Sequence, residues 1–492
     1  MYALILAATA FLGRALVPPR PSYRPPVEAS AGLAEAAAAM PRPEARMQPV
    51  APRAGETEMS AQPFAAWRPG MPAWLLTAAW TAMGLVLWAL FPMTATVLLP
   101  VCAIAPLAWY WAAQRRLPWY APSLTTTALM LAAGYLLINL SWSLSLASAA
   151  TTVALAVVMV GTLHIVLNTL PDLDERPRRA MAVGALVGLG VAGAVLCLEV
   201  FSDQSLRRFL IRLVPALQPS SHHVAMEHGQ LTWLAPYLPN AKVTVLTFMF
   251  WPAALLVRNL GLRRELNYVA LAGAAMVAAT VFSSEHASSQ VAFVGAGMVF
   301  ALFCLRPRLA MSVVVGGWVA ANLLAVPAAW LLYSAQAHRA QWLPDSARHR
   351  VVIWRYTAEQ VHKAPLLGAG VAAARALDAA GEEGQVAPGT RFKLSTDLHS
   401  HNAYLQVWYE AGAVGAAIVL GLGLTVLWGL RAFAAEAQPY LAATFTGCAL
   451  LVASAYSIWA PWFMATLAMA AIFAALGAAL REPQRRVETV KS

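Results

Sequence analysis

The stretch "AMAVGALVGLGVAGAVLCLEVF", residues 180–201, decides the fold class because it is one apolar run with a single charged residue near its end. A run of this length crosses roughly 30 Å of hydrocarbon as an α-helix, whose backbone hydrogen bonds are satisfied internally. The whole 492-residue chain has the same character, since 60% of it is hydrophobic and only 12% is charged. The sequence therefore predicts an all-α, polytopic membrane protein.

Similar runs recur on both sides of this stretch and predict about twelve transmembrane helices. Their expected bounds are 73–91, 93–112, 122–142, 147–169, 180–201, 241–260, 267–283, 290–306, 310–333, 411–430, 440–459 and 460–480. Arginines gather in every second connection, at Arg115, Arg116, Arg176, Arg178, Arg179, Arg258, Arg263, Arg264, Arg306, Arg308, Arg431, Arg481, Arg485 and Arg486. By the positive-inside rule these connections and both termini are cytoplasmic. Segments 202–240 and 334–410 then face the opposite side.

The first 72 residues predict a disordered, Pro/Ala-rich cytoplasmic tail, because they hold many prolines and no apolar periodicity. The native start is expected as late as Met59, and a cleaved signal peptide would invert the charge pattern. Residues 73–333 form the first nine helices, 334–410 a large outer loop, 411–480 the last three helices and 481–492 a cytoplasmic tail.

The formal charge of +11 does not predict nucleic-acid binding, because the basic residues are scattered between apolar spans and form no stripe. All four cysteines lie inside apolar runs, and none has CxxC spacing. We therefore expect no disulfide and no cysteine-bound metal.

The loop 334–410 gathers polar chemistry on the outer side, with eight Lys/Arg, seven Asp/Glu and five histidines. Nine of the ten histidines lie on that side, His164 being the exception. A long segment can cross the membrane whatever its charge, which would explain the arginines. Alternatively the arginines bind phosphate, for which the planar guanidinium is suited.

Two motifs flank this loop: "RVVIWRYTAEQVHKAPLLGAG", residues 350–370, and "HNAYLQVWYEAGAVG", residues 401–415. Together they resemble the signature of the O-antigen ligase and polymerase superfamily of bacterial membrane glycosyltransferases. The resemblance implies a glycosyltransferase C-type bundle in the bacterial inner membrane, a periplasmic active site in the large loop and an essential histidine, which is His401 by motif position. It also implies metal-independent, inverting transfer without a cofactor.

Within the superfamily the chain looks most like the O-antigen ligases. Such enzymes move polysaccharide from undecaprenyl diphosphate to a sugar hydroxyl of lipid A core in lipopolysaccharide biosynthesis. The alternatives are the O-antigen polymerase, the protein O-oligosaccharyltransferase and, from another class, a transporter of lipid-linked glycan. The spans hold almost no charges at their centres, which disfavours the transporter.

His401 is the expected general base, because a diphosphate is already a good leaving group and the acceptor hydroxyl must lose a proton. The sequence pattern places His401 at the start of a helix, and a helix N-terminus disfavours the imidazolium form. His399 is expected to support it. A His-x-His zinc site and a merely capping role for His401 are the alternatives.

Four basic residues are candidates for the donor diphosphate. Arg350 comes first, with Trp354 one helical turn later as a packing or sugar-stacking residue. Lys242 lies at the start of the sixth span, and similar proteins of the superfamily also have a basic residue at the start of this span. Arg391 and Lys393 lie shortly before the histidines in sequence. Each could equally be an ordinary loop or interfacial cation.

Three further motif residues are expected to support the site. Asn402 follows the histidine, and Gly412 and Gly415 are expected to let the tenth helix pack closely against its neighbours.

Two segments depart from the family pattern or stand outside it. The short connection "SSEHASSQ" holds Glu285 and His286 where many superfamily members carry Ser-Arg, so no role is inferred there. In "SLRRFLIRLVPAL", residues 205–217, leucines and Phe209 share one helical face. This pattern favours a helix lying in the membrane surface over direct contact with the diphosphate.

Overall fold

The structure is a computed structural model that describes residues 72–116, 118, 124–219, 223–227, 230–379, 386–396 and 399–481. The expected N-terminal tail with Met59, and the C-terminal tail from residue 482 onward, lie outside the described residues. Everything described below belongs to one compact unit.

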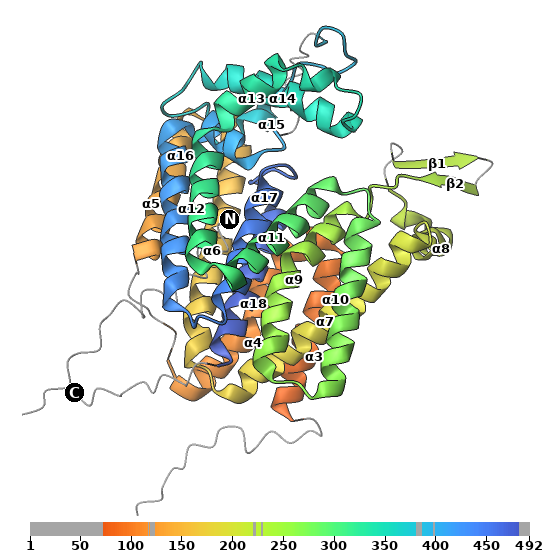
Figure 1. The fold of residues 1–492 in the computed structure, drawn as a ribbon, viewed down its shortest axis with the longest axis vertical. Helices are drawn as coiled ribbons and strands as arrows, with labels where there is room; N and C mark the ends of the chain where they lie inside the picture. Colours follow the sequence, from red (N-terminus) through yellow and green to blue (C-terminus); the bar gives the residue numbers. More distant parts are fainter. Residues whose placement is uncertain are drawn as a thin grey trace, which may run out of the picture. The chain divides into compact units, whose positions relative to one another are not determined.

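The described chain is almost entirely helical, which confirms an all-α polytopic membrane protein (Figure 1). The helices are α3 Ala73–Leu90, α4 Ala95–Gln114, α5 Leu124–Asn139, α6 Leu146–Thr169, α7 Glu175–Phe201, α8 Ser205–Leu213, α9 Asn240–Leu260, α10 Arg264–Phe282, α11 Ala287–Leu305, α12 Pro307–Leu323, α13 Ala325–Ser334, α14 Asp345–Val361, α15 Ala373–Ala379, α16 Ala403–Gly429, α17 Gln438–Val452 and α18 Pro461–Ala479. The strands β1 Val224–Glu227 and β2 Gln230–Leu234 form an antiparallel hairpin.

Each of the twelve expected spans coincides with an apolar helix, but not all are long enough to cross a membrane unaided. Among the described residues nine helices meet that length and composition, and ten do if the pair α12 and α13 counts as one span. The two remaining spans are the shorter apolar helices Thr127–Trp142 and Gln438–Val452.

The expected ninth span is broken, because α12 and α13 meet at Leu324 with a bend of 73°. Pro327 lies in the first turn of α13. Proline has no N–H to donate to the carbonyl four residues earlier, here that of Leu323, so a continuous helix would lose a hydrogen bond at this point. The chain therefore turns before it enters the outer loop.

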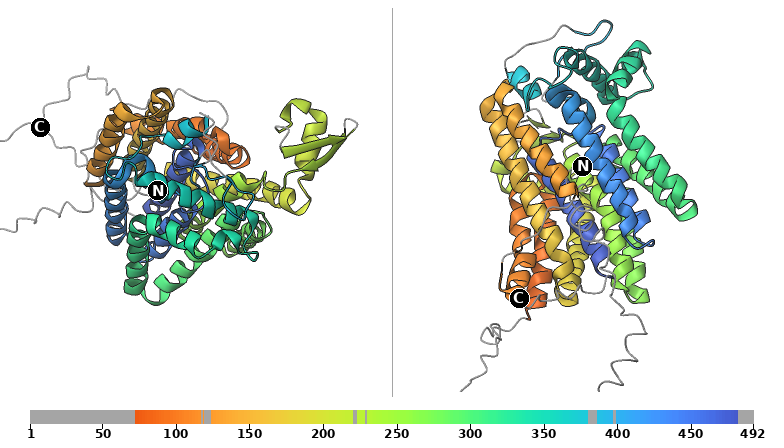
Figure 2. Two further views of the ribbon diagram at one scale, coloured as in Figure 1. Left: turned by 90° about the horizontal axis from the view of Figure 1, so that it is seen from above. Right: turned by 90° about the vertical axis from the view of Figure 1, so that its left-hand side faces the viewer.

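Helix α18 forms the centre of the bundle and is buried along nearly its whole length. It packs against α9, α6 and α4 (Figures 1 and 2). Its sequence is rich in alanine and glycine, which allow close helix contacts in a membrane. Trp88 of α3 donates from Nε1 to Thr466 Oγ1 at 3.2 Å, so one of the few polar groups in this core is paired.

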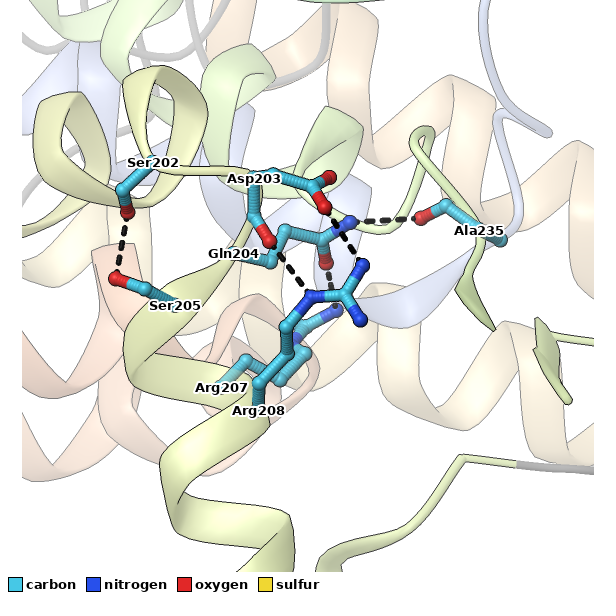
Figure 3. A network of polar contacts seen from close by, with 7 residues as sticks. All are labelled: Ser202, Asp203, Gln204, Ser205, Arg207, Arg208 and Ala235. Atoms are coloured by element: carbon cyan, nitrogen blue, oxygen red, sulfur yellow. Dashed lines mark hydrogen bonds and ion pairs between the residues drawn. The ribbon is translucent and has the colours of Figure 1, made fainter. Parts of the chain in front are cut away.

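The segment between α7 and α9 leaves the bundle as α8 followed by the hairpin (Figure 1). Figure 3 shows how its start is fixed: Gln204 Nε2 donates to Ala235 O at 3.0 Å, and Arg208 pairs with Asp203 at 2.7 Å. Phe209 and Leu213 on α8 are exposed. This exposed apolar face fits the predicted interfacial helix, which stays a prediction.

The outer loop lies across one end of the bundle, where α14 and α15 appear at the top of Figure 1. Side-chain contacts connect α14 to the start of α11 and to the residues just before α16. The loop is therefore placed over the helix ends rather than detached from them.

Candidate active site

His401 is held immediately before α16 in a left-handed backbone conformation, with φ +52°. This region is sparsely populated by residues other than glycine and is often found at functional sites. The helix itself begins at Ala403, and the side chain of Asn402 accepts from Leu405 N at 3.1 Å. Asn402 is therefore the N-cap, and the capping role considered for His401 belongs to its neighbour.

The hydrogen bond made by His401 decides which ring nitrogen carries the proton. Its Nδ1 lies 2.8 Å from Ala455 O in the connection between α17 and α18. A carbonyl oxygen only accepts hydrogen bonds, so Nδ1 is the donor. In the neutral imidazole Nε2 then has the lone pair, which is the tautomer that a general base needs.

The residues before His401 are fixed by α14. Trp354 Nε1 donates to Ser400 O at 2.8 Å, and Ser400 is buried. The rings of His399 and His401 have centroids 4.1 Å apart. Trp354 is thus a positioning residue for the segment that carries the histidine, and His399 is its immediate neighbour.

Arg350 lies on α14 with its guanidinium largely buried, and burial lowers its pKa. Its NH1 donates to Ser288 Oγ at 3.5 Å, at the start of α11. Among the described residues no carboxylate forms an ion pair with Arg350. A half-buried cation beside a hydroxyl group favours an anionic ligand.

The structure brings Arg350 and His401 to the same short connection, residues 454–456. Ser288, which accepts from Arg350, donates to Ser454 O at 3.0 Å. His401 donates to Ala455 O, the next residue. The two motif residues, fifty-one positions apart in the sequence, are therefore linked to adjacent carbonyls, His401 directly and Arg350 through Ser288.

Two residues that the sequence did not single out for catalysis complete this cluster. His286 is 5% exposed, and its Nδ1 lies 2.7 Å from Ser289 Oγ and 3.3 Å from Thr244 Oγ1. Burial, and secondly the charge of Arg350, lower the pKa of His286 to about 4. His286 is thus neutral near pH 7, and Arg350 supplies the positive charge.

Tyr456 is the other residue. Its ring centroid lies 5.8 Å from that of His286. Burial raises the pKa of Tyr456 to about 12, although a hydrogen bond with Thr244 and the charge of Arg350 act in the opposite direction. Tyr456 carried no sequence signal, whereas His286 was marked only by its departure from the family pattern.

Lys242 lies in a different group of charges. Arg207 of α8 and Glu199 of α7 are its electrostatic neighbours. Arg207 donates from its backbone N to Glu199 Oε1 at 3.0 Å. Its NH1 donates to Gln204 Oε1 at 3.3 Å (Figure 3). Burial lowers the pKa of Arg207, and Glu199 opposes that shift. No contact in the described part of the chain joins Lys242 to Arg350.

Arg391 and Lys393 make their described contacts within the outer loop. Arg391 pairs with Asp345 at the start of α14, and both are exposed to solvent. Lys393 is exposed and pairs through its backbone with Val386. The pairing with Asp345 places Arg391 at the start of α14, whereas the role of Lys393 stays a prediction.

Gly412 interrupts α16 with φ +64° and ψ −165°, a conformation adopted almost only by glycine. The motif segment 365–370 fits against this break: Ala413 N donates to Pro365 O at 2.9 Å, and Gly370 N donates to Glu410 O at 3.0 Å. A Cβ on Gly412 would lie 2.3 Å from Leu366 O. Gly412 thus admits loop backbone, whereas the sequence suggested helix-to-helix packing.

Gly415 lies one turn after Ala411 in α16, close to the same break. A Cβ there would lie 2.2 Å from the Cβ of Ala411 and 3.6 Å from the ring of Tyr135. Its small size is needed mainly by its own helix.

A buried polar network, which the sequence did not reveal, fixes this junction. The carboxyl of Glu410 accepts from Ala372 N at 3.2 Å, Ala374 N at 3.3 Å and Gln406 Nε2 at 3.3 Å, and also from Trp459 Nε1. Such donors compensate for the burial of a carboxyl group.

Asn139 of α5 holds the other side of the junction. Its Oδ1 accepts from Val371 N at 2.7 Å, and its Nδ2 donates to Glu410 O at 3.3 Å. The network therefore sets the position of the helix that follows His401.

Among the described residues, no three His, Cys, Asp or Glu side chains gather in a way that could hold a metal ion. Metal-independent chemistry stays a prediction that a chelator can test.

Comparison with known proteins supports the motif assignment. Residues 271–420 match the sequence model of the family described as O-antigen ligase. The chain is also 23% identical over 240 residues to a Rickettsia conorii protein that is named as a proposed polysaccharide ligase. That alignment covers 48% of this chain and spans 56% of the relative, so about half of each is compared.

The family match includes His286, Arg350 and His401, whereas Lys242 and Tyr456 lie outside it. The resemblance seen in the two motifs is thereby confirmed. The region that carries both motifs, residues 271–420, is thus similar to the O-antigen ligase family.

Proposed function

We propose that the protein is a glycosyltransferase that moves a polysaccharide from undecaprenyl diphosphate to a sugar hydroxyl of lipid A core. The observation that carries this proposal is the meeting of His401 and Arg350 at residues 454–456. A ligase or polymerase function is supported by the match of residues 271–420 to the O-antigen ligase family. The donor, the acceptor and the mechanism are the proposed part.

His401 acts as the general base in this reaction. Its Nε2 accepts the proton of the acceptor hydroxyl, while Nδ1 stays bonded to Ala455 O. The hydroxyl oxygen forms a bond to the anomeric carbon of the donor sugar, on the face opposite the diphosphate. The bond from that carbon to the diphosphate oxygen breaks, and the electron pair stays with the diphosphate. The anomeric configuration is therefore inverted.

Arg350 stabilises the charge that develops on the leaving diphosphate. Preorganised cations in a partly dehydrated site act more strongly than in bulk water. His286 stays neutral beside it, so it does not compete for the phosphate as a second cation but helps to shape the cluster. Lys242 and Arg207 form a separate basic group that is available to another part of the lipid-linked donor.

The position of the cluster suits a substrate with a membrane anchor. Arg350 and His401 lie in the outer loop and just before α16, beyond the ends of the spans. A lipid diphosphate has its charge at the same depth, where hydrocarbon ends. We place the protein in the bacterial inner membrane with both termini cytoplasmic, so that this end faces the periplasm.

The test uses purified full-length protein with undecaprenyl diphosphate-linked glycan and lipid A core, in the presence of a chelator. The native protein should transfer glycan, and His401→Ala should lower the rate by about 10² to 10⁴, the usual contribution of general-base catalysis. His362→Ala is the matched control, because it removes another outer-loop imidazole, one that contacts Ala358 O and Trp330, and it should retain most activity. Near-native transfer by His401→Ala would exclude the base assignment, and inhibition by chelator would exclude metal-independent chemistry.

The acceptor is tested in the same assay by offering a second lipid-linked glycan or a protein in place of lipid A core. Transfer only to lipid A core supports the ligase. Chain elongation on the lipid-linked glycan would identify a polymerase, and glycosylation of the protein would identify an oligosaccharyltransferase. Movement of intact lipid-linked glycan across proteoliposomes without any transfer would identify a transporter.

A further inference from the structure

A second basic site lies on the outer loop, away from His401. It is a groove of about 590 Å³ between the short helix Ala337–Arg339, the start of α14 and the segment 386–392. Its lining residues are His338, Arg339, Gln341, Asp345, Arg348, Gly389, Thr390, Arg391 and Phe392. We call it the loop groove.

Positive charge exceeds negative charge in the loop groove. Arg348 and Arg391 both pair with the single carboxylate of Asp345. Arg339 instead donates from NH2 to Pro388 O at 2.7 Å, and no carboxylate in the described part of the chain pairs with it. Three guanidinium groups thus share one carboxylate, which leaves capacity for an external anion.

The walls of the loop groove are fixed by packing. His338 is 1% exposed, and its ring stacks on Tyr333 with centroids 4.1 Å apart. Gly389 has φ +74°, and a Cβ there would lie 2.9 Å from NH2 of Arg339, so the glycine lets the chain pass over the guanidinium. Phe392 stacks on His349 with centroids 5.0 Å apart. Arg339 is therefore held in place before any ligand arrives.

Helix α14 separates this groove from the reaction cluster. Asp345 and Arg348 are three residues apart and share one face of the helix, whereas Arg350 and Trp354 are four apart and share roughly the opposite face. A helix with its side chains is about 10 to 12 Å thick. A saccharide of a few sugars is long enough to reach around α14 from the groove to His401.

We infer that the loop groove binds an anionic saccharide, one that carries phosphate or carboxylate groups, at a distance of a few sugars from the reacting one. The arginines recognise the acidic groups, and Gln341 and Thr390 offer hydrogen bonds to hydroxyls. Trp342, next to Gln341, is 82% exposed and provides an aromatic surface at the rim. The role of this subsite in catalysis rests on the proposed function, but the binding itself does not.

Binding is measured with full-length His401→Ala protein in nanodiscs, so that no turnover interferes. The first probe is a phosphorylated core oligosaccharide, and the second is the same oligosaccharide after phosphatase treatment. The third is the phosphatase-treated oligosaccharide after its carboxyl groups have been reduced. Arg339→Gln combined with Arg391→Gln should weaken binding of the phosphorylated probe by about tenfold or more, since charge-assisted hydrogen bonds are lost. Binding of the form without phosphate and carboxylate should be weak and unchanged.

The control is Arg375→Gln, which removes an exposed arginine of α15 that does not line the groove. Single Arg391→Gln guards against misfolding, because the Arg391 side chain is 75% exposed and should still weaken binding severalfold. Equal binding of charged and uncharged probes, or an equal loss in the Arg375 control, would overturn the inference.

Kinetics then identify the source of the saccharide. In protein that retains His401, the double substitution raises KM for the acceptor if the groove holds lipid A core, and KM for the donor if it holds the polysaccharide. If the native protein transferred no glycan, the proposed function would be rejected, while the result of the binding experiment would still be valid. Normal transfer with unaltered binding would reject the loop groove alone.

Discussion

The two faces of α14 carry arginines in opposite circumstances. Arg350, on the face toward the bundle, is half-buried beside hydroxyl groups and a neutral histidine. Arg391, which meets the other face, is 75% exposed and pairs with Asp345. Both were candidates for a phosphate in the sequence, with Arg350 as the first choice.

The difference shows what makes an arginine a strong anion site. An exposed ion pair is screened by water and salt and contributes little. A buried guanidinium has lost much of its hydration, so a phosphate that pairs with it regains more free energy. Arg350 is thus suited to the charge of a reacting diphosphate, whereas Arg391 and its neighbours are suited to weaker recognition of a glycan.

The largest change in stability is expected from Gly412→Ala, which disturbs the contact between α16 and the loop segment 365–370. The new Cβ would meet Leu366 O at 2.3 Å, and φ is +64°. We expect a loss of about 3 kcal/mol in unfolding free energy from strain and lost loop contacts. Thermal unfolding in detergent measures it as a lower midpoint.

Gly421→Ala is the matched control for this substitution. Gly421 lies in the same helix, and a Cβ there would meet nothing within 4 Å. Alanine is favoured over glycine in a helix by about 0.5 to 1 kcal/mol, so this variant should be unchanged or slightly more stable. Similar midpoints for the two variants would show that loop 365–370 does not depend on the break.

A second effect of similar size is expected when His286 is charged. Its pKa is about 4 in the folded protein, against 6.5 for an ordinary histidine, because burial and Arg350 disfavour the imidazolium. Between pH 6.5 and pH 4 the unfolded chain binds the proton more tightly. Stability is therefore complete above pH 6.5 and falls as the pH decreases toward 4.

This pH dependence should disappear in His286→Gln. The groups facing the imidazole are Arg350, Tyr456, Thr244 and Ser289, and all stay in the variant. Over this range the native protein should lose roughly 3 kcal/mol more than the variant, at about 1.4 kcal/mol per pKa unit. The contributions of the other histidines to the pH dependence cancel in this difference, since both proteins have them. Parallel stability curves from pH 6.5 to pH 4 would contradict a buried neutral His286.

A smaller, kinetic effect is expected from Arg350→Gln. Loss of a charge-assisted hydrogen bond should lower kcat/KM for the lipid diphosphate donor by about 10- to 100-fold, through a higher KM and a lower kcat, because the charge on the diphosphate grows during the reaction. Arg350→Lys should lie between the two, because an ammonium keeps the charge but not the planar fork. Steady-state kinetics with varied donor measure both. Unchanged donor kinetics in Arg350→Gln would remove this residue from the diphosphate site.

The sequence was sufficient for the features that depend on apolar length and on motif order. The twelve apolar runs predicted the helices, although Pro327 was not used to foresee the break at Leu324. The two motifs predicted that His401 and Arg350 belong to one site, and both contact the neighbourhood of residues 454–456. The residue spacing within the two motifs was informative because each motif lies in or next to a helix whose position is set by the bundle.

The remaining features depend on contacts that no local pattern records. The glycine spacing did not reveal that Gly412 receives loop backbone, nor did Glu410 look different from a solvated carboxylate in sequence. Tyr456 joins the cluster from a connection without a motif. Lys242 and Arg391 illustrate the converse, because candidates chosen by position in sequence were drawn into other charge groups.

The smallest effect is expected from Arg391→Gln, and it is the sharpest test of the comparison. The pair with Asp345 is exposed at 75% and 47%, so the unfolding free energy should change by less than about 1 kcal/mol, and by less still at high salt. Donor KM should rise severalfold at most, and only if the groove holds the polysaccharide of the donor, because α14 stands between this residue and His401. If Arg391→Gln instead raised donor KM as strongly as Arg350→Gln, the diphosphate would have to contact both faces of α14. The groove and the reaction cluster would then be one continuous site, and burial could not be what distinguishes the two arginines.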